Sequence, residues 1–263
     1  MPQQSISFDR AADYYDETRG FPPGEERAAA ALIAAVGGLT PASRALEIGV
    51  GTGRIALPLA RHVGLYVGVD ISLAMMARLR AKQRSEPVTL ARASAAHLPF
   101  APAAFDAVVA VHVFHLIPNW PDALAECARV LKPGGLLLHC WNDRSSSAMQ
   151  VLHEAWRQAV PEHLEQRPGV PFAYNNTFAL DYGWRAAGPA QTHAYTQQRS
   201  PAGFLDAHRR RVYSGAWNLD DDVIARGVAA IEAAIAEHFG DPDTPVQDRL
   251  TFVVQPFAPP TDR

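Results

Sequence analysis

Three glycines at alternate positions, Gly49, Gly51 and Gly53, are the strongest chemical signal in this chain. They follow a short apolar run that ends at Ile48, and a helical apolar pattern begins soon after them at Ile55. Glycine permits positive φ and lets a ligand approach main-chain N–H groups, and a following helix points its free N–H groups into the same space. The pattern predicts a strand, a tight turn and a helix that bind a small polar ligand carrying a carboxylate or phosphate.

The spacing of the glycines distinguishes between nucleotide ligands. A dinucleotide fingerprint reads G-x-G-x-x-G, whereas this turn reads G-x-G-x-G with Glu47 two residues before its first glycine. A second apolar run ends at Asp70, 21 residues after Gly49, where a carboxylate can accept both ribose hydroxyls. Ser72 is the better candidate for capping the next helix, which leaves Asp70 for a ligand. These features predict an adenosine ligand without a pyrophosphate bridge.

Four motifs in the same order make the chain resemble the class I S-adenosylmethionine-dependent methyltransferases, of the small-molecule type similar to ubiquinone/menaquinone-pathway methyltransferases. The matching segments are Glu47–Gly53 for the first motif, Val67–Asp70 with Ser72 and Met75 for the second, Phe105–His112 for the fourth strand, and Leu131–Gly135 for the turn before the fifth. The resemblance covers roughly residues 8 to 141. It implies S-adenosyl-L-methionine as the methyl donor and S-adenosyl-L-homocysteine as the product.

The resemblance also implies which residues contact this cofactor. Serine stands at position 94, where the family commonly has an acidic residue that accepts from the adenine amine. The segment that contains Tyr15 and Arg19 resembles a lid over the methionine end, and either Arg19 or Arg54 is a candidate partner of the methionine carboxylate. The predicted cofactor-binding residues are Tyr15, Arg19, Glu47, Gly49, Gly51, Gly53, Asp70, Ile71, Met75, Ser94, Ala95 and Val111.

Two histidines near the end of the predicted fourth strand are the catalytic candidates. Methyl transfer from a sulfonium is a direct displacement that requires the acceptor atom in line with the S–CH3 bond, and a base helps when that atom carries a proton. His112 occupies the position from which a side chain could face the substrate, whereas His115 sits where the family often has a structural histidine. The alternative is a pair of partly buried histidines bonded to backbone groups.

Alternating strands and helices with short links predict a parallel sheet with right-handed crossovers, whose ligands bind at the carboxyl ends of the strands. The resemblance implies an α/β fold, namely the Rossmann-like methyltransferase fold with a mostly parallel seven-stranded sheet, helices on both faces and a helical cap. We expect a single domain over residues 1–263, with a cofactor-binding core at 40–142, a substrate cap at 143–248 and a last strand near 249–257. We also expect the helix after the glycine turn to run from Gly53 to His62 and the fourth strand to run from Ala107 to Phe114.

Composition narrows the function further. The 263 residues are 48% hydrophobic, and 24 basic against 27 acidic side chains give a formal charge of −3, which offers no electrostatic attraction for nucleic acid. Cys127 and Cys140 do not form a disulfide framework and fit a reducing cytoplasm. No metal-ligand spacing and no membrane-spanning stretch is present. The oligomeric state is left open, a homodimer included.

We therefore expect an S-adenosylmethionine-dependent methyltransferase that acts on a small-molecule acceptor. A non-catalytic S-adenosylmethionine-binding protein on the same fold is the main alternative. A dinucleotide-dependent oxidoreductase is disfavoured by the glycine spacing. A nucleic-acid methyltransferase is disfavoured because the fourth strand lacks an Asn-Pro-Pro-aromatic motif. The acceptor, and whether its methylated atom is O, N or C, does not follow from the sequence.

Overall fold

A computed structural model describes residues 5–162 and 168–261 of the chain. The chain forms two compact units, which we describe separately. Unit 1 consists of Met1–Trp141, Pro168–His193 and Phe252–Arg263, and unit 2 of Asn142–Arg167 and Ala194–Thr251. The predicted role of residues 143–248 as a substrate cap stays a prediction.

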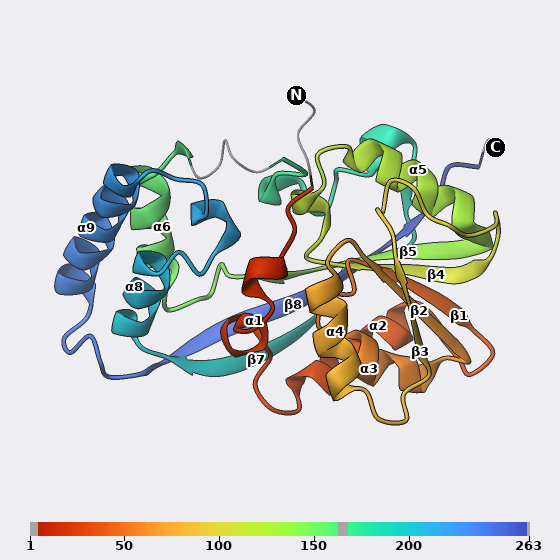
Figure 1. Cartoon of the computed structure of the whole chain (residues 1–263), viewed down its shortest axis with the longest axis horizontal. Helices are drawn as coiled ribbons and strands as arrows, with labels where there is room; N and C mark the ends of the chain where they lie inside the picture. Colours follow the sequence, from red (N-terminus) through yellow and green to blue (C-terminus); the bar gives the residue numbers. More distant parts are fainter. Residues whose placement is uncertain (1–4, 163–167, 262–263) are drawn as a thin grey trace. The chain divides into compact units, whose positions relative to one another are not determined.

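The central element is a mixed sheet in which eight strands are described, in the order β3-β2-β1-β4-β5-β8-β6, with β7 paired to β8 (Figure 1). The strands are β1 Arg44–Ile48, β2 Leu65–Asp70, β3 Val88–Arg92, β4 Phe105–Val111, β5 Leu131–Asp143, β6 Arg185–Ala186, β7 Gln191–Arg199 and β8 Val246–Ala258. The prediction of seven strands was wrong by one. The extra strand is β6, whose two residues pair antiparallel with the end of β8.

The first five strands are parallel, as the alternating pattern predicted. β1 lies between β2 and β4, with Ile48 opposite Val69 on one side and Ala110 on the other. Because parallel strands that are adjacent in register end at the same edge, the glycine turn after β1, Asp70 at the end of β2 and the residues after β4 lie at one edge of the sheet. The order reverses at β1, which is where such sheets bind ligands.

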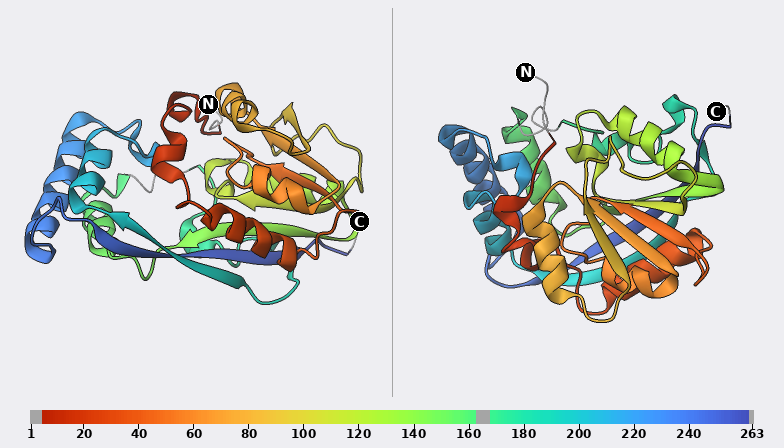
Figure 2. Two further views of the ribbon diagram at one scale, coloured as in Figure 1. Left: turned by 90° about the horizontal axis from the view of Figure 1, so that it is seen from below. Right: turned by 45° about the vertical axis from the view of Figure 1, so that its right-hand side comes forward.

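Helices cover both faces of the sheet in unit 1. They are α1 Tyr15–Arg19, α2 Glu25–Val36, α3 Ala56–Leu59, α4 Leu73–Lys82 and α5 Trp120–Val130. A Cβ added to Gly37 at the end of α2 would collide with Leu138, whereas α5 buries Leu124 and Cys127 in one cluster with Leu137. Neighbouring residues of a strand face opposite sides, so α2 and α5 cover opposite faces (Figure 2).

Unit 2 has its own core, which is built from α6 Gln150–Ala159, α8 Pro201–Arg209 and α9 Asp221–His238. Gly227 of α9 lies so close to Trp156 of α6 that an added Cβ would collide with the indole ring. The carboxylate of Asp248 is fully buried and accepts a hydrogen bond from the Ser147 hydroxyl at 2.5 Å.

Several predicted boundaries shift for local reasons. The helix expected from Gly53 to His62 is the short α3, followed by a 3-10 turn at Ala60–His62, because Gly53 has φ of +79° and cannot begin a right-handed helix. The fourth strand, expected to reach Phe114, ends at Val111, because His112 has φ of +51°.

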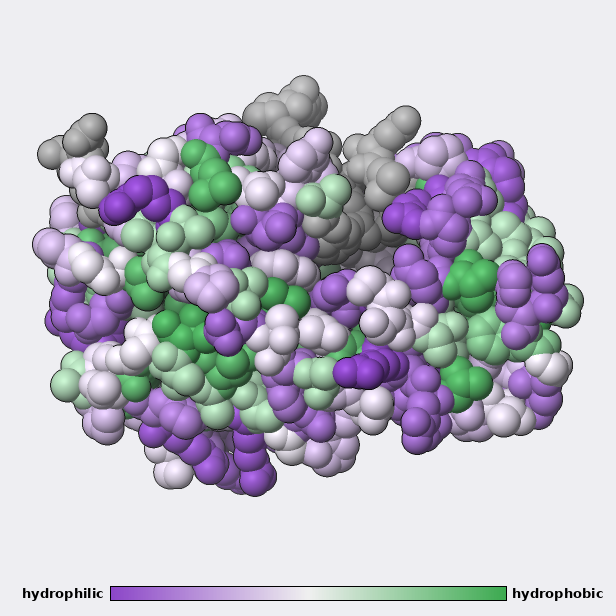
Figure 3. All heavy atoms as spheres, turned by 180° about the vertical axis from the view of Figure 1, so that it is seen from behind, coloured by the Kyte–Doolittle hydropathy of each residue, from purple (hydrophilic) through white to green (hydrophobic). Residues whose placement is uncertain are grey.

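Polar and apolar residues are intermixed on the face seen in Figure 3. Among the helices of the described residues, we find none that is both long enough and apolar enough to cross a bilayer. Cys127 and Cys140 are buried free thiols.

Candidate functional site

The glycine turn after β1 adopts the conformation that its sequence predicts. Gly49, Gly51 and Gly53 have φ of +69°, +55° and +79°, a region that L-residues rarely occupy. A Cβ at Gly49 would also collide with Val113, and one at Gly53 with Leu79. The turn therefore requires glycine for both its backbone shape and its packing, and its main chain stays uncovered by side chains of its own.

Asp70, at the end of β2, holds this turn against the sheet. Its Oδ2 accepts from the Gly51 N–H and its Oδ1 accepts from the Ser72 N–H, both at 2.8 Å. Burial raises the pKa of the Asp70 carboxyl, and backbone hydrogen bonds from Ser72, Gly51 and Ile71 oppose that shift. A carboxylate has about four lone-pair sites, so Asp70 retains the capacity to accept a hydroxyl group from a ligand.

Glu47, the acidic residue of the turn motif, is buried inside the sheet. The Tyr66 hydroxyl on β2 donates to its Oε2 at 2.7 Å, and the two side chains are 0% and 2% exposed for Tyr66 and Glu47. Burial raises the pKa of Glu47 to about 8, against the lowering influence of Tyr66 and of the Arg54 charge. At neutral pH this carboxyl is therefore largely protonated, so it can both donate and accept hydrogen bonds beneath the turn.

The N-terminal segment is fastened to the same turn by two aspartates that sequence reasoning did not single out. Asp16 of α1 accepts from the Thr52 hydroxyl at 2.5 Å and from Lys82 Nζ at 2.6 Å. Asp9 accepts from the hydroxyl of Ser72, the helix-capping residue of α4, at 2.5 Å. That hydroxyl accepts in turn from the N–H of Met75 three residues later, which confirms the predicted cap. These contacts seat the predicted lid segment beside the turn.

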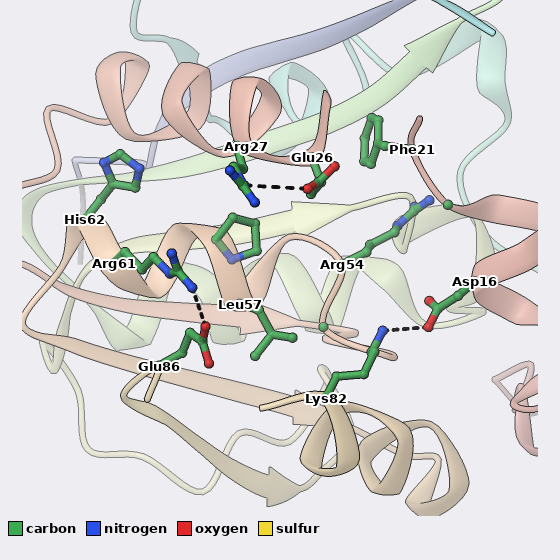
Figure 4. Close-up of a pocket in the computed structure, with 13 residues that line it drawn as sticks. Asp16, Phe21, Glu26, Arg27, Arg54, Leu57, Arg61, His62, Lys82 and Glu86 are labelled. Carbon is green, nitrogen blue, oxygen red and sulfur yellow. Dashed lines mark hydrogen bonds and ion pairs between the residues drawn. The ribbon is translucent and has the colours of Figure 1, made fainter. Parts of the chain in front are cut away.

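Of the predicted lid residues, Tyr15 and Arg19 both meet Arg54. The Arg54 guanidinium donates to the Arg19 carbonyl oxygen and lies 5.8 Å from the Tyr15 ring centroid and 5.6 Å from that of Phe21. Arg54 also lines a pocket of about 460 Å³ between α1, α2, α3 and α4 (Figure 4). Asp70 is absent from the lining of that pocket, so Arg54 faces a different space from the sheet edge.

The predicted adenine-side residues gather next to Asp70. The Ala93 N–H donates to the Asp70 carbonyl oxygen at 3.1 Å, and the chain then turns at Ser94, whose Oγ accepts from the Ala96 N–H at 3.3 Å. Ala95 lies within this turn. The Ile71 carbonyl oxygen accepts from Arg92. Met75 is 3% exposed, and its side chain packs under Gly51.

The end of β4 has an unusual backbone. Val111 closes the strand in register with Cys140 of β5, and the His112 N–H donates to the Cys140 carbonyl oxygen at 3.0 Å. His112 then adopts φ of +51°, which is costly for a side chain with a Cβ. His115 follows in the 3-10 turn Phe114–Leu116. Both predicted catalytic histidines therefore lie at the ligand edge of unit 1, and only His112 sits on a strained backbone.

A third histidine, His139 on β5, was missed by sequence reasoning because it lies inside an apolar strand run. It is 2% exposed, stacks on Trp141 with ring centroids 5.2 Å apart, and meets the ring edges of Phe114 and Phe178. Burial lowers its pKa to about 4, and a hydrogen bond that His139 makes to the Asn175 side chain opposes that shift. His139 is therefore a neutral aromatic partner of this group.

The sheet edge as a whole fits an adenosyl ligand. A carboxylate bonded to the glycine turn stands at the end of the second strand, Gly49 and Gly51 after the first strand are half-buried, and small residues follow the third. Among the residues that the structure describes, no three His, Cys, Asp or Glu side chains form a metal-binding group. The arrangement at the sheet edge can bind and orient a nucleoside-bearing small molecule.

Comparison with known proteins agrees with this geometry. The family described as "Methyltransferase domain" matches residues 46–139. The demethylmenaquinone methyltransferase of Tropheryma whipplei (strain Twist) is 36% identical over 140 residues, which are 51% of this chain and 56% of that protein. The phosphatidylethanolamine N-methyltransferase of Cereibacter sphaeroides is 37% identical over 135 residues, 50% of this chain and 64% of that protein. The chain thus spans less than two thirds of these relatives.

Solved structures show the same fold over most of the chain. YcgJ of Bacillus subtilis superposes with a TM-score of 0.58 at 18% identity and covers 88% of this chain and 97% of its own. The Haemonchus contortus phosphoethanolamine N-methyltransferase 2, solved with phosphomonomethylethanolamine and S-adenosylhomocysteine, has a TM-score of 0.55 at 21% identity and covers 94% and 57%. Taken with the turn, the carboxylate and the strand order, these matches assign residues 46–139 to the methyltransferase domain family and show that the chain has the fold of methyltransferases.

Proposed function

We propose that this protein transfers a methyl group from S-adenosylmethionine to a small-molecule acceptor at the carboxyl edge of the unit 1 sheet. The observation that carries the proposal is the hydrogen bond between the Gly51 N–H and Asp70. It holds an open glycine main chain beside a carboxylate that still has lone pairs, which is the donor and acceptor set that an amino-acid tail and a ribose require.

When bound, S-adenosylmethionine supplies an electrophilic methyl group on a sulfonium. Asp70 would accept the ribose hydroxyls, and the main chain of Gly49 and Gly51 would border the methionine portion. The turn at Ser94 and Ala95 would border the adenine. These residues hold the donor in a fixed orientation, which is the main contribution a protein makes to an in-line displacement.

His112 is proposed as the base that takes a proton from the acceptor. Histidine is the side chain that most readily exchanges protons around pH 7. The φ of +51° at His112 supports a functional role, because strained backbone persists where the surroundings impose it and clusters at active sites. His115 is the alternative base.

The acceptor is proposed to have an apolar portion. Trp141, Phe114 and Phe178 surround His139 near the end of β5, and aromatic side chains of this kind line small-molecule sites. The names of the relatives agree with this class, since they include a demethylmenaquinone and a phosphatidylethanolamine methyltransferase. The buried free thiols of Cys127 and Cys140 support a reducing, cytoplasmic location.

The test is calorimetric titration of S-adenosylhomocysteine into the wild type, Asp70→Asn and the matched control Asp122→Asn on α5. Asparagine keeps the shape of Asp70 but loses the charge and one acceptor oxygen, so we expect affinity to fall tenfold or more, about 1.4 kcal/mol. The affinity of the Asp122→Asn control for S-adenosylhomocysteine should lie within threefold of that of the wild type.

Equal affinity of Asp70→Asn and the wild type would contradict the proposed site, as would binding of NAD in preference to S-adenosylhomocysteine. Release of S-adenosylhomocysteine over a library of small apolar acceptors then tests the transfer itself. Tight binding with no turnover on any member would favour the non-catalytic alternative.

A further inference from the structure

The pocket of about 460 Å³ in unit 1 is separate from the sheet edge that holds Asp70. Its floor is the outer side of α3 and the turns that flank it, where Arg54, Leu57, Pro58 and Arg61 recur at helical spacing. Its walls come from α1, the start of α2 and the end of α4 (Figure 4). The volume falls in the range of small-molecule sites.

The charges around this pocket are paired, with one exception. Three carboxylates each meet a cation: Glu86 Oε1 lies 2.6 Å from Arg61, Asp16 Oδ2 lies 2.6 Å from Lys82, and Glu26 Oε1 lies 3.8 Å from Arg27. The fourth cation is Arg54, and within the described residues no carboxylate forms an ion pair with it. Among the arginine, lysine, aspartate and glutamate side chains that line the pocket, one positive charge is therefore uncompensated.

Arg54 is held in place without using up its capacity for an anion. Its Nη1 donates to the Arg19 carbonyl oxygen, and its guanidinium lies over the rings of Tyr15 and Phe21. A guanidinium carries about five N–H donors in a fixed plane, which suits carboxylate and phosphate oxygens. Figure 4 shows the side chain extended along the pocket toward Phe21, on the opposite side from the Arg61–Glu86 ion pair.

The floor adds an apolar contact beside this charge. Leu57 and Pro58 lie between Arg54 and Arg61, and Phe21 closes the side next to Arg54. A ligand that places an anionic group on the guanidinium would therefore rest its carbon skeleton on these side chains. Purely inorganic anions would leave that surface wet, and cations would be repelled by Arg54.

We propose that this pocket is a second binding site, for a small molecule with one carboxylate or phosphate on an apolar body. The pocket and the proposed methyl-donor site share the glycine turn. Gly53 of this turn lines the pocket, and Asp16, which also lines it, accepts a hydrogen bond from the Thr52 hydroxyl of the same turn. An occupant can therefore adjust the turn, and the two ligands bind at different places.

The experiment follows assigned backbone amide signals of the full chain by NMR during titration with benzoate and with phenyl phosphate, up to about 20 mM, a range suited to millimolar dissociation constants. Benzyl alcohol and benzylamine are the matched controls, since they keep the ring and change the charge. We expect the amides of residues 20–27 and 53–62 to shift with one or both anions. The two anions distinguish a carboxylate site from a phosphate site, and the controls should bind at least fivefold more weakly.

Two variants test whether Arg54 supplies the positive charge that binds the anion. Arg54→Met should weaken the anion at least tenfold, whereas Arg80→Met, on α4 outside the pocket, should leave its affinity unchanged. Leu57→Glu places a carboxylate in the floor and should abolish binding, and circular dichroism confirms that each variant is folded. The titration is repeated with saturating S-adenosylhomocysteine, under which the same amides should still shift.

The proposal is overturned if neither anion shifts these amides, if benzyl alcohol binds as well as the anions, or if Arg54→Met binds like the wild type. It is also overturned if the anions shift the amides around Asp70 and Ser94 instead and S-adenosylhomocysteine displaces them. Because the first titrations contain no S-adenosylhomocysteine, failure of the proposed methyl-donor site leaves this result readable.

Discussion

Replacement of Glu47 by glutamine should change the pH dependence of stability more than any other single substitution at the site. Burial raises the pKa of Glu47 from 4.5 to about 8, so the folded protein keeps a proton that the unfolded chain releases above pH 4.5. Glutamine is neutral at every pH and can still accept from the Tyr66 hydroxyl. The free energy of unfolding of Glu47→Gln is therefore no longer reduced by the burial of a titratable carboxyl.

The sign and the size follow from proton linkage. Between the two pKa values the folded state binds one more proton than the unfolded state, so the contribution of Glu47 to the free energy of unfolding falls as pH rises. The slope is about 1.4 kcal/mol per pH unit, and from pH 5 to pH 8 the loss is about 4 kcal/mol. Glu47→Gln should therefore gain stability relative to the wild type by about this amount over that range.

The assay is chemical unfolding of both proteins at pH 5, 6, 7 and 8, with the difference in unfolding free energy plotted against pH. All other groups titrate alike in the two proteins, so the difference isolates Glu47. Glu17→Gln on the exposed α1 is the matched control and should give a flat difference. Tyr66→Phe should lower the free energy of unfolding at pH 8, because it removes the hydroxyl donor that stabilises the Glu47 carboxylate.

A flat difference between Glu47→Gln and the wild type would refute the reasoning. So would a difference that shrinks as pH rises, because that slope belongs to a carboxyl whose pKa is lowered by folding.

Two further substitutions test the catalytic strand end and unit 2. Glycine accommodates the φ of +51° at position 112 without strain, so His112→Gly removes the imidazole alone. We expect turnover at pH 7 to fall about 100-fold with the affinity for S-adenosylhomocysteine unchanged. Undiminished turnover in a steady-state assay would exclude His112 as the base. Gly227→Ala forces a methyl group into Trp156 and should cost about 2 kcal/mol in denaturant unfolding, although alanine is the better helix former; a stabilised variant would show that α6 and α9 can separate freely.

Local sequence predicted the parts of the site that depend on backbone chemistry. Alternate glycines permit a turn of positive φ that other residues disfavour, and the structure has that turn at Gly49, Gly51 and Gly53. Ser72 caps α4 as its position predicted, and the parallel core follows from apolar runs that alternate with helical segments. These features involve neighbours within a few residues, so the pattern along the chain contains the information.

The ends of helices and strands were harder to predict from the sequence where two local preferences compete. The helix after the turn was expected from Gly53, although the left-handed glycine delays it to Ala56. The eighth strand, β6, has two residues and no pattern of its own, since it exists only through its pairing with β8.

The tertiary structure alone decided which polar groups meet. Tyr66 reaches Glu47 across two strands, Asp9 reaches Ser72 across 63 positions, and Asn175 meets His139 from a segment that lies outside the sheet. Asp13 and Arg78 form an ion pair of the same kind. Such contacts depend on where distant segments are placed by packing, and hydrophobic packing is not directional enough to be read from residue types. The sequence by itself therefore determined the glycine turn, and the fold determined the charge and protonation of the groups around it.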